Sequence, residues 1–192
     1  MPIPRIERIV STSRQEQSYP PSGSVLPRQA ILDLLHGEPP LLADYLDLAS
    51  QLQPQGFDLT LREVSAFDGP GQIGVSNDER VLPPAKPLAT DPLGYFELGP
   101  GAYLATLNEV VNLPLDIMAL GRPRSSLLRS GVTVGTAVWD AGYHGRSQCM
   151  LIVSNAAGFR VAKDARILQL VFFRLAGAAE EGYEGTYQGE NL

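Results

Sequence analysis

Cysteine and histidine are scarce in this 192-residue sequence, and their scarcity excludes several kinds of site. The single cysteine, Cys149, cannot form an intrachain disulfide, and with only His36 and His144 beside it no Cys/His metal cluster can form. A zinc deaminase is excluded for the same reason, since its H-x-E and P-C-x-x-C motifs require more than one cysteine. A chain without disulfides suits a reducing compartment, so we expect a cytoplasmic location.

Lysine and long apolar runs are also lacking. Two of the 15 basic residues are lysines, Lys86 and Lys163, and the other thirteen are arginines. Arginine forms forked contacts with phosphate, so some of these side chains are candidates for phosphate binding. The net charge of −6 gives no electrostatic reason to expect nucleic acid or an anionic membrane as the main partner. No N-terminal apolar run approaches the length of a signal peptide or a membrane span.

The standard nucleotide and hydrolase motifs are absent or unconvincing. The sequence contains neither the P-loop pattern G-x-x-x-x-G-K-[ST] nor the nucleophile pattern G-x-S-x-G. Residues 69–74 match the dinucleotide pattern G-x-G-x-x-G. Pro83 and Pro84 follow soon after, however, and no helix with a downstream ribose-binding acid is evident. We interpret residues 69–74 as a turn.

Short apolar segments between the 16 prolines and 19 glycines predict a β-rich fold. The chain is long enough for one domain with an extension. Phe57, Leu59 and Leu61 alternate with polar residues, which is typical of a half-buried strand. Further short strands are predicted at 95–98, 103–111, 116–120, 132–139, 148–153 and 166–175. Their close spacing favours a barrel or jelly roll over an alternating βα sheet.

The remaining segments are predicted as short helices, a loop and two extensions. Ser24 can cap a helix in which Ile31, Leu34 and Leu35 share one face and which ends at Gly37. A second short helix is predicted around residues 41–48, and a long loop or hairpin over residues 68–92. We divide the chain into an N-terminal arm (1–24), a β domain (25–179) and a C-terminal tail (180–192). The tail lacks the apolar spacing to pack by itself, so we expect it to become ordered on binding something.

Arg124-Ser125-Ser126 has the composition of an anion site. The two hydroxyls and the free N–H groups at the start of a short helical turn can bind phosphate, and Arg124 or Arg129 can add charge-assisted bonds. A helix cap with surface arginines is equally compatible with these residues.

Asp140 follows a strand that ends at Trp139. Gly142 and Gly145 on either side of Tyr143 allow a tight hairpin whose backbone can approach a ligand. An aspartate at such a strand end can orient a water molecule for attack on phosphorus. The alternative is a structural Asx turn that leads into the hairpin.

Together these elements resemble the dUTPase and dCTP deaminase superfamily. Five segments match its motifs in family order, at 56–59, 121–127, 140–145, 166–170 and 185–189, and the lead-in at 26–61 resembles the deaminase-like branch. The resemblance implies a mainly β fold, a distorted jelly-roll β-barrel with short N-terminal helices. It also implies a homotrimer with nucleotide sites between subunits, and Mg²⁺ bound mainly through substrate phosphates and water.

The resemblance also assigns roles to individual residues. Asp140 corresponds to the water-activating base, and Tyr143 to the tyrosine that lies under the deoxyribose and excludes a 2′-hydroxyl. The other substrate-binding positions are Arg124, Ser125 and Ser126 on the phosphates, Gln169 in the fourth motif, and Tyr187 and Gln188 in a tail that folds over the nucleotide. The glycine-rich fifth motif of the ordinary trimeric dUTPases is missing.

An absent carboxylate decides between members of the superfamily. The deaminases carry a catalytic Glu on the strand after the third motif, but no Asp or Glu occurs from Ala141 to Lys163. Deamination would thereby lose general acid–base assistance of roughly 10²–10⁴-fold. We therefore predict a dUTP diphosphatase that releases dUMP and pyrophosphate. The alternatives are a dCTP deaminase or bifunctional enzyme with a Glu from elsewhere, such as Glu109, and a non-catalytic nucleotide-binding trimer that signals through its tail.

Overall fold

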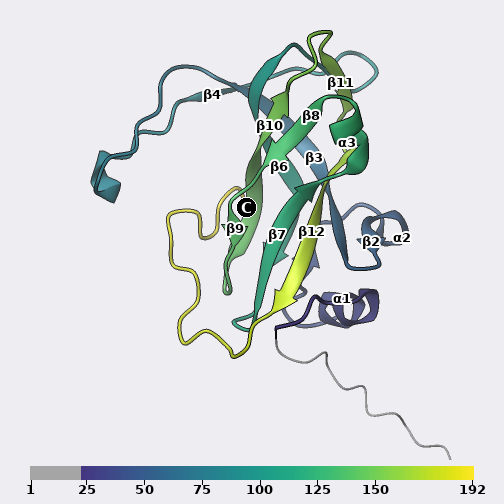
Figure 1. The fold of residues 1–192 in the computed structure, drawn as a ribbon, viewed down its shortest axis with the longest axis vertical. Coiled ribbons are helices and arrows are strands. Elements are labelled where there is room, and N and C mark those ends of the chain that lie inside the picture. The colour runs from purple at the N-terminus through teal and green to yellow at the C-terminus, as the bar shows by residue number, and fades with distance from the viewer. Residues whose placement is uncertain (1–22) are drawn as a thin grey trace, which may run out of the picture.

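The computed structural model describes residues 23–192, and most of their strands belong to one strongly curved β-sheet with short helices at its periphery (Figure 1). Seven strands make up its main path in the order β8-β10-β6-β3-β12-β7-β9, and all of their pairings are antiparallel. Their bounds are β3 Gly56–Phe67, β6 Gly101–Asn112, β7 Ile117–Pro123, β8 Val132–Gly135, β9 Val138–Trp139, β10 His144–Val153 and β12 Arg166–Arg174. The predicted mainly β class is confirmed. Nearly all of the predicted arm, residues 1–24, lies outside the described residues.

The two ends of this sheet are joined by a very short connection. β8 pairs with β10 at one end and β9 pairs with β7 at the other, and only Thr136 and Ala137 lie between β8 and β9 in the sequence. The sheet must therefore curl until β8 and β9 approach each other. No hydrogen-bonded pairing joins these two end strands among the described residues, so the sheet forms an open half-barrel. The single strand predicted for residues 132–139 is wrong, because the chain changes strand partners in its middle.

Five further strands lie beside this path. β1 (Leu42–Ala43) pairs with β6, whereas β2 (Leu52–Gln53) and β4 (Ala85–Pro87) pair with β3. β5 (Tyr95–Leu98) and β11 (Phe159–Ala162) form a separate two-stranded sheet. The strand predicted at 95–98 agrees with β5, but β11 was not predicted.

The predicted excursion over residues 68–92 is confirmed as a hairpin. Ser65, Ala66 and Phe67 at the end of β3 pair with β4. Between these strands the chain projects far from the sheet and carries the 3-10 turn η1 (Asn77–Glu79) (Figure 1). Phe67 and Leu82, at the base of this projection, reach the cleft described below.

The first helix agrees with its prediction except at its start. α1 (Arg28–Leu35) buries Ile31 and Leu35. Its N-cap is Pro27, so the prediction that Ser24 caps it is wrong. The carbonyl of Ser24 instead accepts a hydrogen bond from the Arg174 N–H at 2.9 Å, because residues 23–26 run extended beside β12.

The helix predicted around residues 41–48 is also wrong. Leu42–Ala43 is a strand, and α2 (Leu48–Gln51) begins only after it. The Asp47 carboxylate caps α2 by accepting from the N–H groups of Ala49 and Ser50, each at 3.2 Å. No helix in the described part of the chain is long and apolar enough to cross a membrane.

The first half of β3, residues 56–61, is buried on both faces. Phe57, Leu59 and Leu61 are fully buried, as their spacing predicted, but Asp58 and Thr60 are also only 2% exposed. The prediction of a half-buried strand is therefore wrong for Asp58 and Thr60, whereas Arg62 is exposed as the alternation predicted. β3 lies in the middle of the sheet, and Gln51 of α2 covers its second face by donating to the Asp58 carbonyl at 2.8 Å.

Glu109 belongs to this buried polar layer. Its carboxylate accepts from Gln51 Nε2 at 2.6 Å, from the Thr60 N–H at 2.9 Å and from Thr60 Oγ1 at 2.7 Å. Burial raises the pKa of Glu109, and these bonds act against that rise. Glu109 does not line the cleft described below. Its carboxylate is instead bonded to Gln51 and Thr60, which disfavours the alternative that Glu109 acts as the catalytic acid of a deaminase.

Truncation of Glu109 tests this structural role. Glu109→Ala leaves the buried donors of Gln51 and Thr60 without an acceptor, and we expect the free energy of unfolding to fall by about 3 kcal/mol. Urea denaturation measures this change. The exposed Glu180→Ala serves as the control and should stay within about 0.5 kcal/mol of the parent protein. A similarly small change in Glu109→Ala would contradict the role.

Candidate active site

Asp140 and Tyr143 lie in the tight turn between β9 and β10. The Tyr143 N–H donates to the Asp140 carbonyl at 3.1 Å, so the backbone closes this turn. The exposed carboxylate of Asp140 makes no hydrogen bond to any residue in 23–192, so the Asx turn is not formed. Gly142 has a φ of 82°. A Cβ there would also lie 2.5 Å from the Gly182 Cα, so both the turn and the close approach of the tail require glycine.

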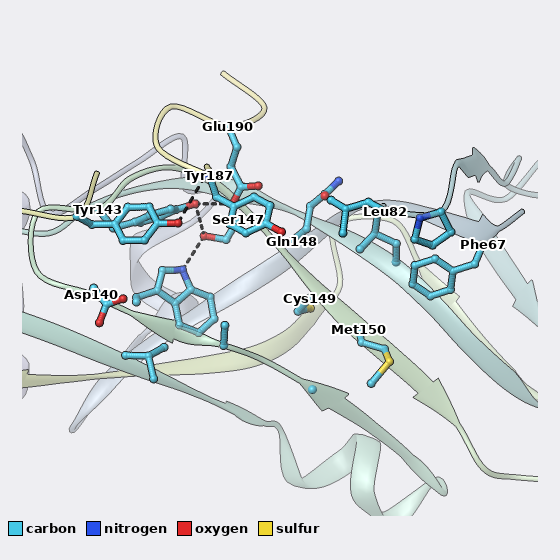
Figure 2. A pocket seen from close by; sticks show the side chains of 17 residues that line it. Phe67, Leu82, Asp140, Tyr143, Ser147, Gln148, Cys149, Met150, Tyr187 and Glu190 are labelled. Atoms are coloured by element: carbon cyan, nitrogen blue, oxygen red, sulfur yellow. Dashed lines mark hydrogen bonds between the residues drawn. The ribbon is translucent and has the colours of Figure 1, made fainter. Parts of the chain in front are cut away.

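A cleft of about 660 Å³ opens beside this turn, and its walls come from several elements. Figure 2 shows Asp140 and Tyr143 at one end and Phe67 and Leu82 at the other. The lining is mostly apolar or aromatic, and it consists of Phe67, Leu82, Pro83, Leu104, Gly135, Ala137, Val138, Trp139, Asp140, Tyr143, Ser147, Gln148, Cys149, Met150, Tyr183, Tyr187 and Glu190. Its size and composition are typical of a small-molecule site.

Four of the lining side chains form a continuous hydrogen-bonded chain. Trp139 Nε1 donates to Ser147 Oγ at 2.6 Å, Ser147 Oγ lies 3.1 Å from the Tyr143 hydroxyl, and that hydroxyl donates to Glu190 Oε1 at 2.8 Å (Figure 2). Burial raises the pKa of Tyr143, so its hydroxyl stays protonated. Ser147 and Glu190 were not predicted as site residues.

The thiol in the cleft is not a nucleophile. Cys149 is only 4% exposed, and burial raises its pKa to about 12. A thiol with this pKa stays protonated near neutral pH, and the thiolate is the reactive form.

The tail is docked on the same turn and on the start of β10. The Gly189 N–H donates to the His144 carbonyl at 2.7 Å, and the Arg146 N–H donates to the Glu190 carbonyl at 2.9 Å. The amide of Gln188 accepts from the His144 N–H at 2.9 Å and donates to the Gly142 carbonyl at 3.0 Å. Gln188 therefore binds the hairpin backbone, whereas Tyr187 lines the cleft.

The second motif (residues 121–127) and the fourth motif (residues 166–170) meet around Asp58, a buried carboxylate of the first motif (residues 56–59). Asp58 Oδ2 lies 3.1 Å from Arg124 Nε and 3.5 Å from Arg166 Nη1. Burial raises the pKa of Asp58, and the two guanidinium groups act against that rise. Gln169 pairs with Asp58 on one side and with Arg122 on the other. Asp58 lay in a recognised motif, but its contact with Arg124 could not be inferred from sequence spacing.

The two serines of the second motif are exposed at the start of α3 (Ser125–Arg129). Arg124 is the N-cap residue, and no side chain caps this helix. Neither Ser125 nor Ser126 uses its hydroxyl in a hydrogen bond within the described residues. Both hydroxyls are therefore available to a ligand, and a capping role for them is not supported.

One chain does not bring all the predicted site residues together. β7 pairs Ala119 with Trp139, which places Asp140 level with Met118. Arg124 lies six residues further along this extended segment, a distance of about 20 Å at 3.3 Å per residue. Asp140, Tyr143, Tyr187 and Gln188 thus form one group, and Arg124, Ser125, Ser126 and Gln169 form another.

The fold and motifs place the chain in a known class of protein. Residues 25–175 match the family model described as dCTP deaminase-like, and the chain belongs to this family. It is 46% identical over 168 residues to a probable deoxyuridine 5′-triphosphate nucleotidohydrolase of Methanosarcina mazei, covering 88% of this chain and 98% of that protein. A protein of the same name in Archaeoglobus fulgidus is 49% identical over 152 residues, or 79% of this chain and 89% of the relative.

A solved structure supports the fold. The crystal structure of 2′-deoxycytidine 5′-triphosphate deaminase from Agrobacterium tumefaciens matches with a TM-score of 0.59 and 23% identity. The match covers 79% of this chain and 48% of that protein, so this chain spans about half the length of the solved one. It confirms the predicted barrel fold of the superfamily.

Gly142 provides a test of tail docking that does not depend on activity. Gly142→Ala places an alanine in a left-handed backbone conformation, which costs roughly 1–2 kcal/mol, and its Cβ would also clash with Gly182. We expect the variant to fold while a Glu-specific protease cleaves its residues 180–192 several-fold faster. Gly177→Ala, whose added Cβ meets nothing within 4 Å, is the matched control. Equal cleavage rates in the two variants would contradict the docking.

Proposed function

We propose that this protein is a dUTP diphosphatase, which hydrolyses dUTP to dUMP and pyrophosphate. Its relatives in Methanosarcina mazei and Archaeoglobus fulgidus, similar over most of the chain, are named as probable enzymes of this activity. The observation that carries the proposal is the Asp140 carboxylate, which lies on the wall of the cleft beside Tyr143 without a hydrogen-bond partner in the described chain. Such a carboxylate is available to bind and orient a water molecule.

The proposed reaction is a displacement at the α-phosphorus. A water molecule held by Asp140 gives its proton to the carboxylate as its oxygen bonds to the phosphorus. The bond from this phosphorus to the bridging oxygen breaks, and pyrophosphate leaves. The ring of Tyr143 would lie against C2′ of the sugar, where a ribose hydroxyl has no room.

The triphosphate would bring Mg²⁺ into the site. Among residues 23–192 no group of three or more His, Cys, Asp or Glu side chains is arranged to hold a metal ion. A donor set of phosphate oxygens and water therefore suits this chain better than a protein cage. Bound in this way, the ion would neutralise negative charge on the phosphates.

The separation of the two residue groups supports a site between subunits. Arg124, Ser125 and Ser126 present a guanidinium and two unused hydroxyls, which suit phosphate oxygens. They lie too far from Asp140 to serve the same phosphate within one chain. A second copy would supply them, with Gln169 on the same side, as expected for a homotrimer with three inter-subunit sites.

The tail would complete the site. Tyr187 is 38% exposed at the cleft and can cover the base or sugar. Gln188 would act by holding the tail on the hairpin, given its bonds to Gly142 and His144. Closure over bound nucleotide by residues 180–192 would exclude bulk water from the reacting phosphate.

Product analysis separates this proposal from its alternatives. A dUTP diphosphatase forms dUMP and pyrophosphate from dUTP, a deaminase forms dUTP from dCTP, and a regulatory protein binds without turnover. The deaminase is disfavoured because β10 carries no acid and Glu109 is committed to Gln51 and Thr60. Formation of dUTP as the main product from dCTP would overturn the proposal.

Replacement of the proposed base tests the chemistry. Asp140→Asn keeps the size of the side chain but cannot accept the proton, so kcat should fall by at least about 10²-fold. Nucleotide affinity, measured by calorimetry, should change little. The exposed Asp78→Asn, on the projecting hairpin, is the control. A kcat for Asp140→Asn close to that of the control would contradict the assignment.

Mixed oligomers test whether subunits share sites. Asp140→Asn and Arg124→Ala should each be nearly inactive alone. Co-expressed at equal levels, they should regain about a quarter of the parent activity, because a random assembly combines one intact half from each variant in that fraction of sites. Recovery can be measured on the unselected mixture, and among doubly tagged trimers, from which the pure species are removed, the fraction should rise to about one third. If both residues acted within one chain, no activity would return.

A further inference from the structure

Glu190 supplies a second carboxylate to the cleft, and nothing in the proposed reaction uses it. We propose that Glu190 is a positioning residue that holds the Tyr143 ring in its sugar-excluding position, so that discrimination against ribonucleotides depends on the docked tail. This inference rests on the proposed function, since it concerns the same site. It adds a specificity role for a tail residue outside the motifs recognised in the sequence.

The donors and acceptors around Tyr143 fit together in only one direction. The indole N–H of Trp139 can only donate, so Ser147 Oγ accepts it at 2.6 Å. The ionised carboxylate of Glu190 can only accept, so the Tyr143 hydroxyl gives it the proton at 2.8 Å. The remaining Ser147 proton then points to the Tyr143 oxygen at 3.1 Å. Each hydrogen bond therefore runs from donor to acceptor in the order Trp139, Ser147, Tyr143, Glu190, and Glu190 is the final acceptor of this hydrogen-bonded series.

The tail also contacts the Tyr143 ring itself. The Tyr183 ring packs edge-on against it with the ring centroids 5.8 Å apart. Glu190 is anchored close by, since its carbonyl accepts from the Arg146 N–H and the neighbouring Gly189 N–H donates to His144. Tyr143 is consequently only 6% exposed. Without Glu190, its hydroxyl would keep Ser147 as its only side-chain partner among the described residues.

A steric wall discriminates between sugars only while it stays in place. A 2′-hydroxyl is small, so a movement of the Tyr143 ring by less than the width of the ring would make room for it. A ring free to change rotamer would therefore admit the hydroxyl at little cost. The carboxylate of Glu190 is half-buried beside the Tyr143 ring. Burial raises the pKa of Glu190, whereas the hydrogen bond from Tyr143 lowers it and so favours the charged form that accepts this bond. Tail docking and sugar selectivity are thereby coupled.

Two substitutions at Glu190 separate hydrogen bonding from mere packing. Glu190→Ala removes the acceptor, whereas the amide oxygen of Glu190→Gln can still accept the Tyr143 proton. The matched control is Glu184→Ala, which removes an exposed tail carboxylate without a partner in the described chain. We expect the dUTP/UTP ratio of kcat/KM to fall roughly tenfold in Glu190→Ala, mainly through better use of UTP. Glu190→Gln should retain the ratio and Glu184→Ala should not affect it.

The single tryptophan gives a second readout that needs no turnover. Trp139 belongs to the same hydrogen-bonded chain and lines the cleft, so its emission reports both the network and bound nucleotide. Ser147→Ala, which removes the indole acceptor, defines the emission of a disrupted network. We expect Glu190→Ala to shift the emission towards that of Ser147→Ala. In an Asp140→Asn background, which prevents turnover, the Kd of the Glu190→Ala variant for UTP should approach its Kd for dUTP.

These measurements distinguish failure of the inference from failure of the proposed function. If the parent protein does not hydrolyse dUTP, the proposed function fails, yet the Kd ratio still tests Glu190. An unchanged dUTP/UTP ratio in Glu190→Ala overturns the inference. Equal loss of the ratio in Glu190→Ala and Glu184→Ala also overturns it, because a general effect of tail charge would then be responsible.

Discussion

The unequal pairing of β10 is the constraint on which the cleft depends. One edge of β10 pairs with β6 from His144 to Val153, but the other edge pairs with β8 only from Met150 to Val153. Backbone groups at the start of β10 are therefore left for other partners, and buried N–H and C=O groups must find them. The tail takes up those of His144 and Arg146, and the following residues line the cleft.

A second constraint organises the part of the molecule that carries Arg124 and the exposed serines of α3. Three motifs that are separate in the sequence converge on Asp58, which pairs with Arg124 and Arg166. A buried carboxylate is costly unless charged groups face it, and the two guanidinium groups meet that requirement. In return, Asp58 holds Arg124 at the start of α3 before any ligand arrives. The planar fork of arginine, which a lysine lacks, suits such a fixed orientation.

Local patterns predicted the elements that depend on local interactions. The apolar alternation of Phe57, Leu59 and Leu61 identified the core face of β3, and the glycines around Tyr143 identified the turn before β10. The errors arose where distant segments decide the outcome. Ser24 does not cap α1 because Arg174 binds its carbonyl, and Asp58 is buried because α2 covers its strand. The split of residues 132–139 depends on the two strands β7 and β10, which no local pattern reveals.

The candidate site shows the same division. Motif order nominated Asp140, Tyr143 and Arg124 as candidates, but it gave no indication of the contact between Glu190 and Tyr143, which are 47 residues apart. That contact also bears on how the tail works. A docked tail could block the site, yet a cleft of about 660 Å³ remains beside Tyr143 with the tail in place, within the usual range for ligand sites. Docking of the tail is therefore compatible with an open site, and its bonds to the hairpin make it part of the wall that a nucleotide would meet.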